Sequence, residues 1–193
     1  MTMRMMLAAV LGAVAMFLWS FVAHDVIPIA FAGIREIPKE KEVTAVLNDL
    51  IGDNPGTYMF PWVGPDASKE EKEKAMADYA KHPSGLLVYH SPGSRPFNFP
   101  KFLTVEFIVE LVESLLAVFL LAQTRHVSMG ARIVFVSLFG VAVALWTNMS
   151  YWNWHGFSRR YTGAYICTEV VAFILAGIVI ALVLKNKPLN DSQ

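Results

Sequence analysis

Apolar residues along this chain gather in four long windows that are separated by polar segments. The windows cover residues 5–23, 102–122, 133–149 and 162–184. A helix rises ~1.5 Å per residue and needs roughly 20 apolar residues to cross the core of a bilayer. Each window has about this length. The pattern therefore predicts an all-α membrane protein built as a four-transmembrane-helix bundle.

The first window is also compatible with a secretory signal peptide, because Arg4 precedes it. A cleavage-site-like triplet, Ala30-Phe31-Ala32, follows, but it lies well beyond the end of the apolar stretch. We therefore expect the window to be retained as the first transmembrane helix.

The polar segment after this window has the pattern of a small folded cap. Helical periodicity predicts a helix over 39–52, with Val46 and Leu50 on its apolar face. The sequence SKEE, which resembles a capping box, predicts a second helix over 68–81. Two short apolar runs, 58–62 and 86–90, predict strands. We expect three parts: transmembrane helix 1 (1–23), an α+β extramembrane cap (24–101), and transmembrane helices 2–4 with a short cytoplasmic tail (102–193).

Composition agrees with a membrane protein. Hydrophobic residues make up 55% of the chain, and the net charge is zero. Nothing in this balance indicates a nucleic-acid partner. The single cysteine, Cys167, rules out an intrachain disulfide and a cysteine-based zinc site within one chain.

Basic residues indicate how the predicted helices are oriented. Those in or beside the short segments on the side of the two termini are Arg4, Arg125, Arg132, Lys185 and Lys187. Lys and Arg in short loops favour the cytoplasmic side. We therefore expect both termini in the cytoplasm and residues 24–101 on the opposite side.

The second window contains three carboxylates at helical spacing. Glu106, Glu110 and Glu113 follow an i, i+4, i+7 pattern and so form one stripe on a helix. Glu169 on the fourth helix lies ~10 Å from the outer end, level with Glu110. Asn148 on the third helix shares this polar outer half. We expect the stripe to face a neighbour or a cavity, where it binds a cation or ligand or carries protons.

Two other interpretations of these residues remain open. The carboxylates could instead form a structural network with Arg159, Arg160 and Lys101. His24, His90 and His155 are candidate metal ligands on the outer side, since imidazole and carboxylate suit zinc, copper or iron. No metal-binding motif such as H-E-x-x-H supports that site.

The segment YWNWHGFSRRYT, before the fourth window, is rich in aromatic residues and arginine. Arg159 and Arg160 could hold a lipid headgroup phosphate or another anionic ligand. The simpler interpretation, which we favour, is an aromatic belt at the membrane interface.

Three stretches, FLWSFVAHDVIP, GTYMFPWV with SGLLVYH, and WNWHGFSRRYT, resemble a group of uncharacterised small bacterial four-helix membrane proteins with a large first periplasmic loop. The resemblance implies a multi-pass protein of the bacterial inner membrane, with residues 24–101 in the periplasm. It implies no activity, cofactor or catalytic residue.

The sequence therefore leads to a first hypothesis and two alternatives. The first is a non-enzymatic binding or accessory subunit that uses the cap and the polar outer half to bind lipid headgroups, a small ligand or other membrane subunits. One alternative is a membrane enzyme or redox and metal-binding subunit that uses the glutamates with His24 or His155. The other is a component of a proton or ion pathway. No catalytic residue and no cofactor is assigned by the sequence.

Overall fold

The computed structural model describes residues 1–124 and 128–184. Arg125, Lys185 and Lys187, which entered the orientation prediction, lie outside the described residues. The chain divides into two compact units. The helical unit is formed by Met1–Ile34 with Asn98–Gln193, and the small unit by Arg35–Phe97.

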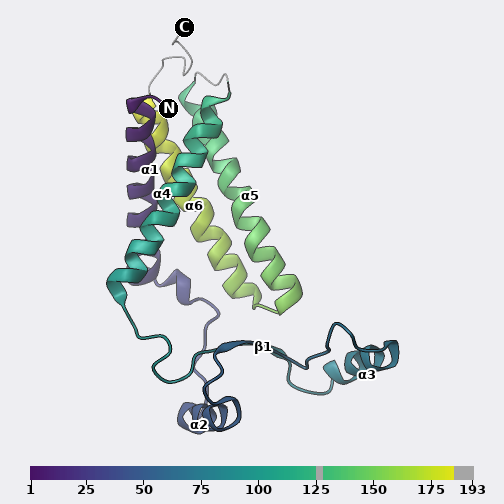
Figure 1. Cartoon of the computed structure of the whole chain (residues 1–193). Helices are drawn as coiled ribbons and strands as arrows, with labels where there is room; N and C mark the ends of the chain where they lie inside the picture. Colours follow the sequence, from purple (N-terminus) through teal and green to yellow (C-terminus); the bar gives the residue numbers. More distant parts are fainter. Residues whose placement is uncertain (125–127, 185–193) are drawn as a thin grey trace. The chain divides into compact units, whose positions relative to one another are not determined.

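Four long helices build the described part of the helical unit (Figure 1). They are α1 (Met3–Phe21), α4 (Phe99–Ala122), α5 (Met129–His155) and α6 (Arg159–Leu184), and they coincide with the four predicted windows. All four begin ahead of their windows because polar side chains cap them. Thr2, Asn98, Ser128 and Ser158 each accept a hydrogen bond from a backbone N–H of the first turn. Arg132, which stands just before the predicted window 133–149, lies in the first turn of α5 and is buried.

Among the described helices, three are long and apolar enough to cross a membrane. These are α1 with its continuation to Val26, α5 and α6. The fourth long helix, α4, has 24 residues, but its glutamates give it too many charges for a simple apolar span. The structure thus agrees with a helical membrane protein that has three candidate spans among the described helices. The fourth predicted crossing, α4, is not one of these three.

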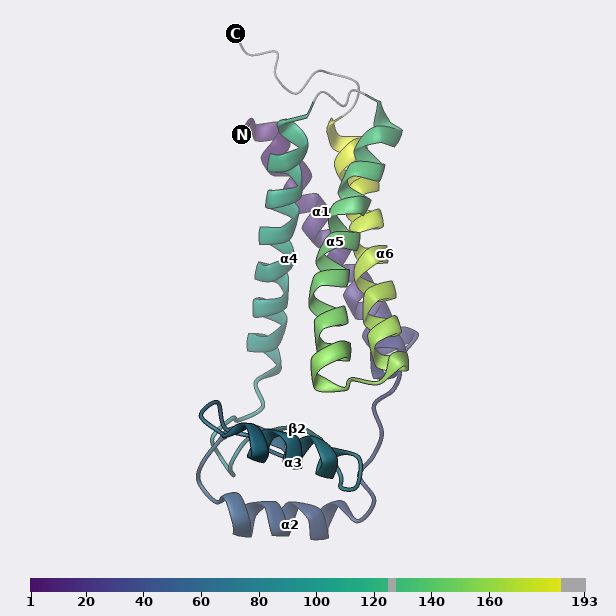
Figure 2. The same cartoon turned by 90° about the vertical axis from the view of Figure 1, so that its right-hand side faces the viewer.

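Helix α1 connects the other helices of this unit. It packs along both α4 and α6, and α6 packs in turn along α5 (Figures 1 and 2). Contacts between α4 and α5 are few. In Figure 1 the N-terminal half of α4 diverges from α5. One side of α4 is therefore left without a helical neighbour at the end that carries the glutamates.

Small residues allow the helices to approach closely. A Cβ added at Gly140 of α5 would lie 2.3 Å from the Cβ of Phe173 on α6. A Cβ at Gly12 of α1 would lie 2.5 Å from the Oγ of Ser114 on α4, whose hydroxyl donates to the Ala9 carbonyl at 2.8 Å. These contacts agree with the small-residue packing of membrane helices.

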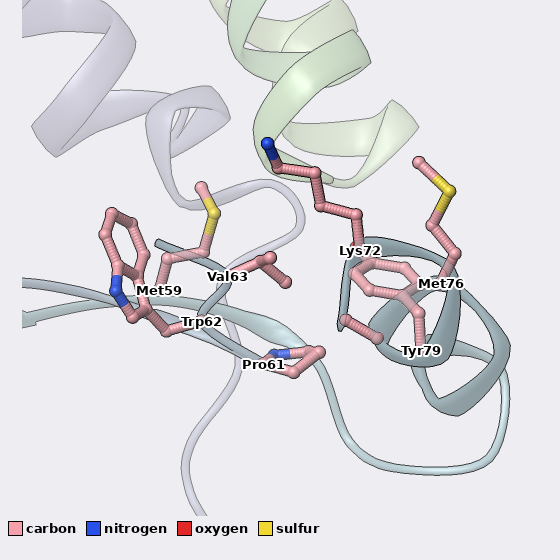
Figure 3. Close-up of a pocket in the computed structure, with 8 residues that line it drawn as sticks. Met59, Pro61, Trp62, Val63, Lys72, Met76 and Tyr79 are labelled. Carbon is pink, nitrogen blue, oxygen red and sulfur yellow. The ribbon is translucent and has the colours of Figure 1, made fainter. Parts of the chain in front are cut away.

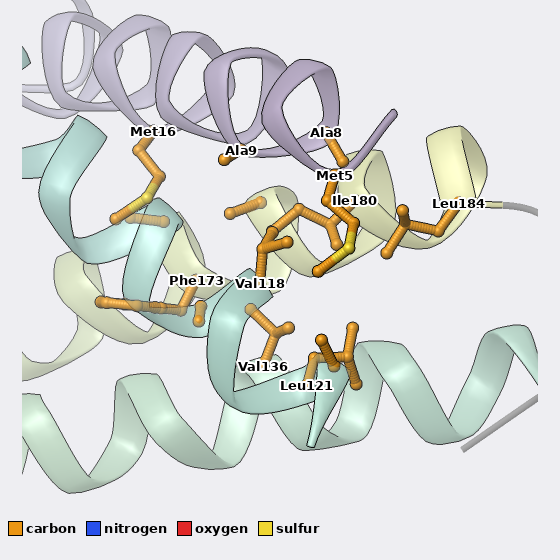
Figure 4. Close-up of a cluster of buried hydrophobic side chains, with 14 residues drawn as sticks. Met5, Ala8, Ala9, Met16, Val118, Leu121, Val136, Phe173, Ile180 and Leu184 are labelled. Carbon is orange, nitrogen blue, oxygen red and sulfur yellow. The ribbon is translucent and has the colours of Figure 1, made fainter. Parts of the chain in front are cut away.

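The core of the helical unit is an apolar cluster shared by all four helices. Met16, Val118, Val136, Phe173 and Ile180 are among its buried members (Figure 4). Most of the cluster comes from the N-terminal part of α1 and the C-terminal parts of α4 and α6. The end of the unit near the N-terminus of α1 is therefore filled mainly with apolar side chains, and the buried Arg132 also lies there.

The helical unit extends beyond the first apolar window. A π-helical turn, η1 (Val22–Val26), and a short 3-10 helix, η2 (Ile29–Phe31), continue from α1. A Cβ at Gly33, which has a φ of +85°, would lie 2.7 Å from the backbone N of Tyr161 on α6. Because this close contact holds residues up to Ile34 against α6, the boundary between the units falls after residue 34. The cap predicted from residue 24 therefore starts later.

The small unit contains two helices and two strands. These are α2 (Glu40–Ile51), β1 (Gly56–Phe60), α3 (Lys69–Tyr79) and β2 (Gly85–Tyr89). The strands pair antiparallel, with Tyr58 opposite Leu87. Both helices match their predictions, and Ser68 forms the expected capping box with Glu71. The first strand begins and ends two residues earlier than predicted, since Pro61 lies just after its last residue.

The apolar face of α2 is only partly covered, because the helix has no buried residue. Val46 is 55% exposed and Leu50 is 76% exposed. The small unit thus presents apolar surface that its own residues do not cover.

Candidate functional site

The glutamate stripe of α4 faces inward at its centre. Glu110 is 5% exposed, Glu113 is half-buried and Glu106 is exposed. Burial at the middle position and exposure at the N-terminal end follow from the packing, because α1 covers part of this face while α5 diverges from it. The predicted inward orientation is therefore correct for Glu110.

Glu110 is bonded through one carboxylate oxygen only. The hydroxyl of Ser20 on α1 donates to its Oε1 at 2.7 Å. Its Oε2 is buried and has no hydrogen-bond partner among the described residues. A buried acceptor without a partner costs about 1–3 kcal/mol, and more when the group is charged. Of the carboxylate oxygens in the described part of the chain, this one is fully buried without a hydrogen-bond partner.

Glu169 belongs to the same region from the side of α6. The amide nitrogen of Asn148, on α5, donates to Glu169 Oε2 at 2.9 Å and to the Ala144 carbonyl at 2.9 Å. Asn148 is itself buried. The predicted site residues Asn148 and Glu169 are thus in direct contact.

The two halves of the site interact electrostatically. Glu113 on α4 repels both Glu169 on α6 and Glu106 on its own helix. The side chain of Tyr165 on α6 lies close enough to interact with Glu106 and Glu169. We call Glu106, Glu110, Glu113 and Glu169 the acidic cluster. The cluster brings together carboxylates from α4 and α6, two helices that make few direct contacts with each other.

The cluster has no cationic partner among the described residues. The ion pairs there are Lys39–Glu42, Lys69–Glu73 and Lys81–Asp78, all within the small unit. Arg159 and Arg160 are exposed and form none, and neither does Lys101. The structural network that was an alternative interpretation of the carboxylates is therefore not formed by these residues.

The candidate metal ligands have separate surroundings. The Nδ1 of His24 lies 2.8 Å from the carbonyl of Ser20, and the Nε2 of His90 lies 3.1 Å from Arg95 in the small unit. The ring of His155 packs against Tyr151. Within residues 1–124 and 128–184, no three His, Cys, Asp or Glu side chains are grouped in a way that would hold a metal ion.

A row of aromatic rings, which the sequence analysis did not identify, leads toward the acidic cluster. Phe157 stacks on Tyr161 with ring centroids 5.1 Å apart, and Tyr161 contacts Tyr165 at 4.4 Å. Their i, i+4, i+8 spacing is visible in the sequence and could have revealed this face of α6. Tyr165, at one end of this row, lies beside Glu106 and Glu169 of the acidic cluster.

The chain matches no family model, no curated protein and no solved structure. The geometry of the acidic cluster is therefore the basis for assigning a function.

Proposed function

We propose that this protein is a membrane-embedded binding or accessory subunit, whose acidic cluster binds a cationic group of a ligand or of a partner protein. The observation that carries the proposal is Glu110. The residue is 5% exposed, yet its Oε2 lacks a partner among the described residues. A positively charged donor that entered the site would satisfy this oxygen and offset the repulsion between Glu113 and Glu169.

Membrane insertion strengthens the need for such a partner. A charged side chain near the centre of a bilayer costs about 2.5–3.5 kcal/mol on insertion scales. Four carboxylates in one region without an ion pair in the described part of the chain would retain much of this cost. An external cation that pairs with these carboxylates would reduce the cost of placing their charges in the membrane. Binding of the cation would therefore stabilise the protein.

The open side of α4 supplies a route for this cation. Glu106 is exposed at the N-terminal end of α4, where contacts with α5 are few. A basic side chain of a neighbouring membrane helix, or the ammonium group of a ligand, could approach Glu110 and Glu113 from that side. In this proposal Asn148 and Ser20 orient the two carboxylates by hydrogen bonds.

Binding accounts for the structure better than transport through the bundle. The apolar cluster around Val118, Phe173 and Ile180 occupies most of the end of the helical unit opposite the acidic cluster, and the charged residue described as buried there is Arg132, a fixed cation. A pathway would need polar groups through this end to stabilise an ion or proton. The enzyme alternative lacks a specific feature that would favour it.

We further propose that α4 is a fourth crossing, that both termini face the cytoplasm of a bacterial cell, and that the small unit lies in the periplasm. Support comes from the length of α4, which has 24 residues and packs along α1. The ends of α1 and α6 nearest the termini lie together, and Arg4 Nε donates to the Val183 carbonyl at 2.7 Å. A basic residue at this end agrees with the cytoplasmic side.

The proposal can be tested by affinity purification of the full-length chain from native membranes in mild detergent. Mass spectrometry would identify co-purifying proteins and small molecules. Glu110→Gln and Glu169→Gln keep the shape and hydrogen-bonding capacity of the side chains but remove their charge. We expect each to reduce recovery of a cation-bearing species by about tenfold, which corresponds to about 1.4 kcal/mol.

Glu70→Gln is the matched control, because Glu70 is an exposed carboxylate on α3 in the other unit. It should leave recovery unchanged. Equal recovery from all three variants, or a co-purifying species without a basic group, would contradict the proposal.

A further inference from the structure

The small unit contains an apolar pocket of about 360 Å³ between the end of β1 and helix α3. Met59, Trp62 and Val63 line it from β1 and the segment that follows, and Lys72, Met76 and Tyr79 line it from α3 (Figure 3). Both walls belong to one compact unit. The pocket is separate from the acidic cluster, which lies in the helical unit.

The walls of this pocket expose large apolar side chains. Trp62 is 70% exposed, Met76 is 76% exposed and Tyr79 is 57% exposed. Grouped apolar exposure of this kind marks interaction sites more often than isolated surface residues do. Methionine and aromatic side chains also adapt well to flexible apolar ligands.

Lys72 is the only charged residue that lines the pocket. The neighbouring lysines Lys69 and Lys81 form ion pairs with acids of α3. Lys72 forms none among the described residues, and its Nζ donates to the Pro65 carbonyl at 3.3 Å. The sequence explains this difference, since no acidic residue stands three or four positions from Lys72. Its ammonium group is therefore available to an anion at the rim.

We propose that this pocket binds one long-chain fatty acid, with the acyl chain between Trp62 and Met76 and the carboxylate on Lys72. A volume of about 360 Å³ is near the lower end for ligand pockets, which favours a single chain over a two-chain lipid. The charge at the rim is complementary to a carboxylate.

An acyl chain fits these walls better than a peptide segment does. A peptide would bring backbone N–H and C=O groups that need hydrogen-bond partners when buried. Among the lining side chains, Trp62 and Lys72 can only donate, and the Tyr79 hydroxyl alone can accept from a backbone N–H. An acyl chain has no such groups to satisfy. A chain with candidate membrane spans also has access to the fatty acids of a membrane.

The inference can be tested on the full-length chain in lipid nanodiscs with a hexadecanoic acid that carries a photoactivatable diazirine. After illumination, mass spectrometry of the peptides would locate the labelled residues. We expect labelling in 59–63 and 72–79. An excess of hexadecanoate should suppress it at least about fivefold, whereas the same concentration of hexadecanol should suppress it much less.

Two variants and one control sharpen the result. Lys72→Gln should reduce labelling of this region by about threefold to tenfold, because it removes the charge that pairs with the carboxylate. Met76→Asp should reduce it further by placing a negative charge in the apolar wall. Lys74→Gln, on the same helix but outside the pocket, should have no effect.

Labelling confined to the long helices of the helical unit, or equal labelling of wild type, Lys72→Gln and Met76→Asp, would overturn the inference. Equal competition by hexadecanol and hexadecanoate would also overturn it, since the site would then not recognise the carboxylate. Because the acidic cluster selects the opposite charge, Glu110→Gln should leave this labelling unchanged. The two proposals can therefore fail separately.

Discussion

The hydroxyl of Ser20 on α1 donates a hydrogen bond of 2.7 Å to Glu110 on α4, in the part of the helical unit that holds the acidic cluster. This contact joins two helices that are far apart in the sequence. It is the only hydrogen bond to the Glu110 carboxylate among the described residues. We therefore expect Ser20 to hold the side chain of Glu110 in its inward orientation.

The first prediction concerns this pair. Ser20→Ala should lower the free energy of unfolding by about 1–2 kcal/mol, since it leaves both oxygens of Glu110 without a partner. A double-mutant cycle with Glu110→Leu should give a coupling energy of about 1 kcal/mol. Denaturant unfolding in a fixed detergent measures both values. A coupling energy close to zero would show that the bond does not contribute.

The second prediction concerns the contact between α5 and α6. Gly140→Ala should destabilise the protein by about 1–3 kcal/mol, because the new Cβ would lie 2.3 Å from the Cβ of Phe173. Gly130→Ala, on the same helix, meets no atom within 4 Å and should be neutral or slightly stabilising. Thermal unfolding of the two variants provides a direct comparison. Similar melting temperatures would contradict the close packing of α5 on α6.

The sequence predicts the helices and their buried faces better than it predicts the contacts between them. The helices of the helical unit follow from runs of apolar residues, and α3 follows from the capping box of Ser68 and Glu71. The inward face of α4 follows from the spacing of its glutamates. Periodicity identifies a face in this way, but it does not identify the neighbour that the face contacts.

The candidate site shows the same limit. Asn148 and Glu169 were both candidates, but their direct hydrogen bond depends on the packing of α5 against α6. Ser20 was not a candidate, because one hydroxyl on an apolar helix carries no pattern. Arg159 and Arg160 seemed suitable partners by their position along the chain, yet they lie exposed at the start of α6. The closeness of charges in sequence does not determine ion pairing in space.

A third prediction concerns the pH dependence of the small unit. The backbone N–H of Ser68 donates to the Glu71 carboxylate at 2.7 Å. This bond, with a smaller contribution from the Ser68 side chain, lowers the pKa of Glu71 from its ordinary value of 4.5. Because the folded pKa is depressed, the contribution to stability is present above pH 4.5 and is lost as the pH falls through the folded pKa.

The titration of Glu71 can be followed by NMR of its side-chain carboxyl carbon. We expect a midpoint below 4.5 in the wild type and a higher midpoint in Ser68→Ala. Ser68→Thr, which preserves the capping hydroxyl, is the control and should titrate like the wild type. An unchanged midpoint in Ser68→Ala would show that the Ser68 side chain does not contribute, because alanine keeps the backbone N–H that donates to Glu71.

A fourth prediction tests the proposed topology. In a Cys167→Ser background, which removes the single native cysteine, Glu70→Cys on α3 should react with a membrane-impermeant maleimide added to intact cells. Met3→Cys, at the start of α1 and 86% exposed before the mutation, should react only after the membrane is opened. Labelling of both positions in intact cells, or the reverse pattern, would contradict a periplasmic small unit with cytoplasmic termini.

The central claim is that the acidic cluster surrounds the inward-facing Glu110 and has no cationic partner among the described residues. A lysine placed within the cluster provides the most direct test. Glu169→Lys should keep the free energy of unfolding within about 1 kcal/mol of the wild type, because the new ammonium group can pair with Glu113. Cys167→Lys, two residues earlier on an exposed face of α6, should cost up to about 2.5–3.5 kcal/mol. The measurement is the free energy of unfolding of both variants in bilayers of the same lipid composition. If Glu169→Lys is destabilised as strongly as Cys167→Lys, the carboxylates do not form an unneutralised inward cluster.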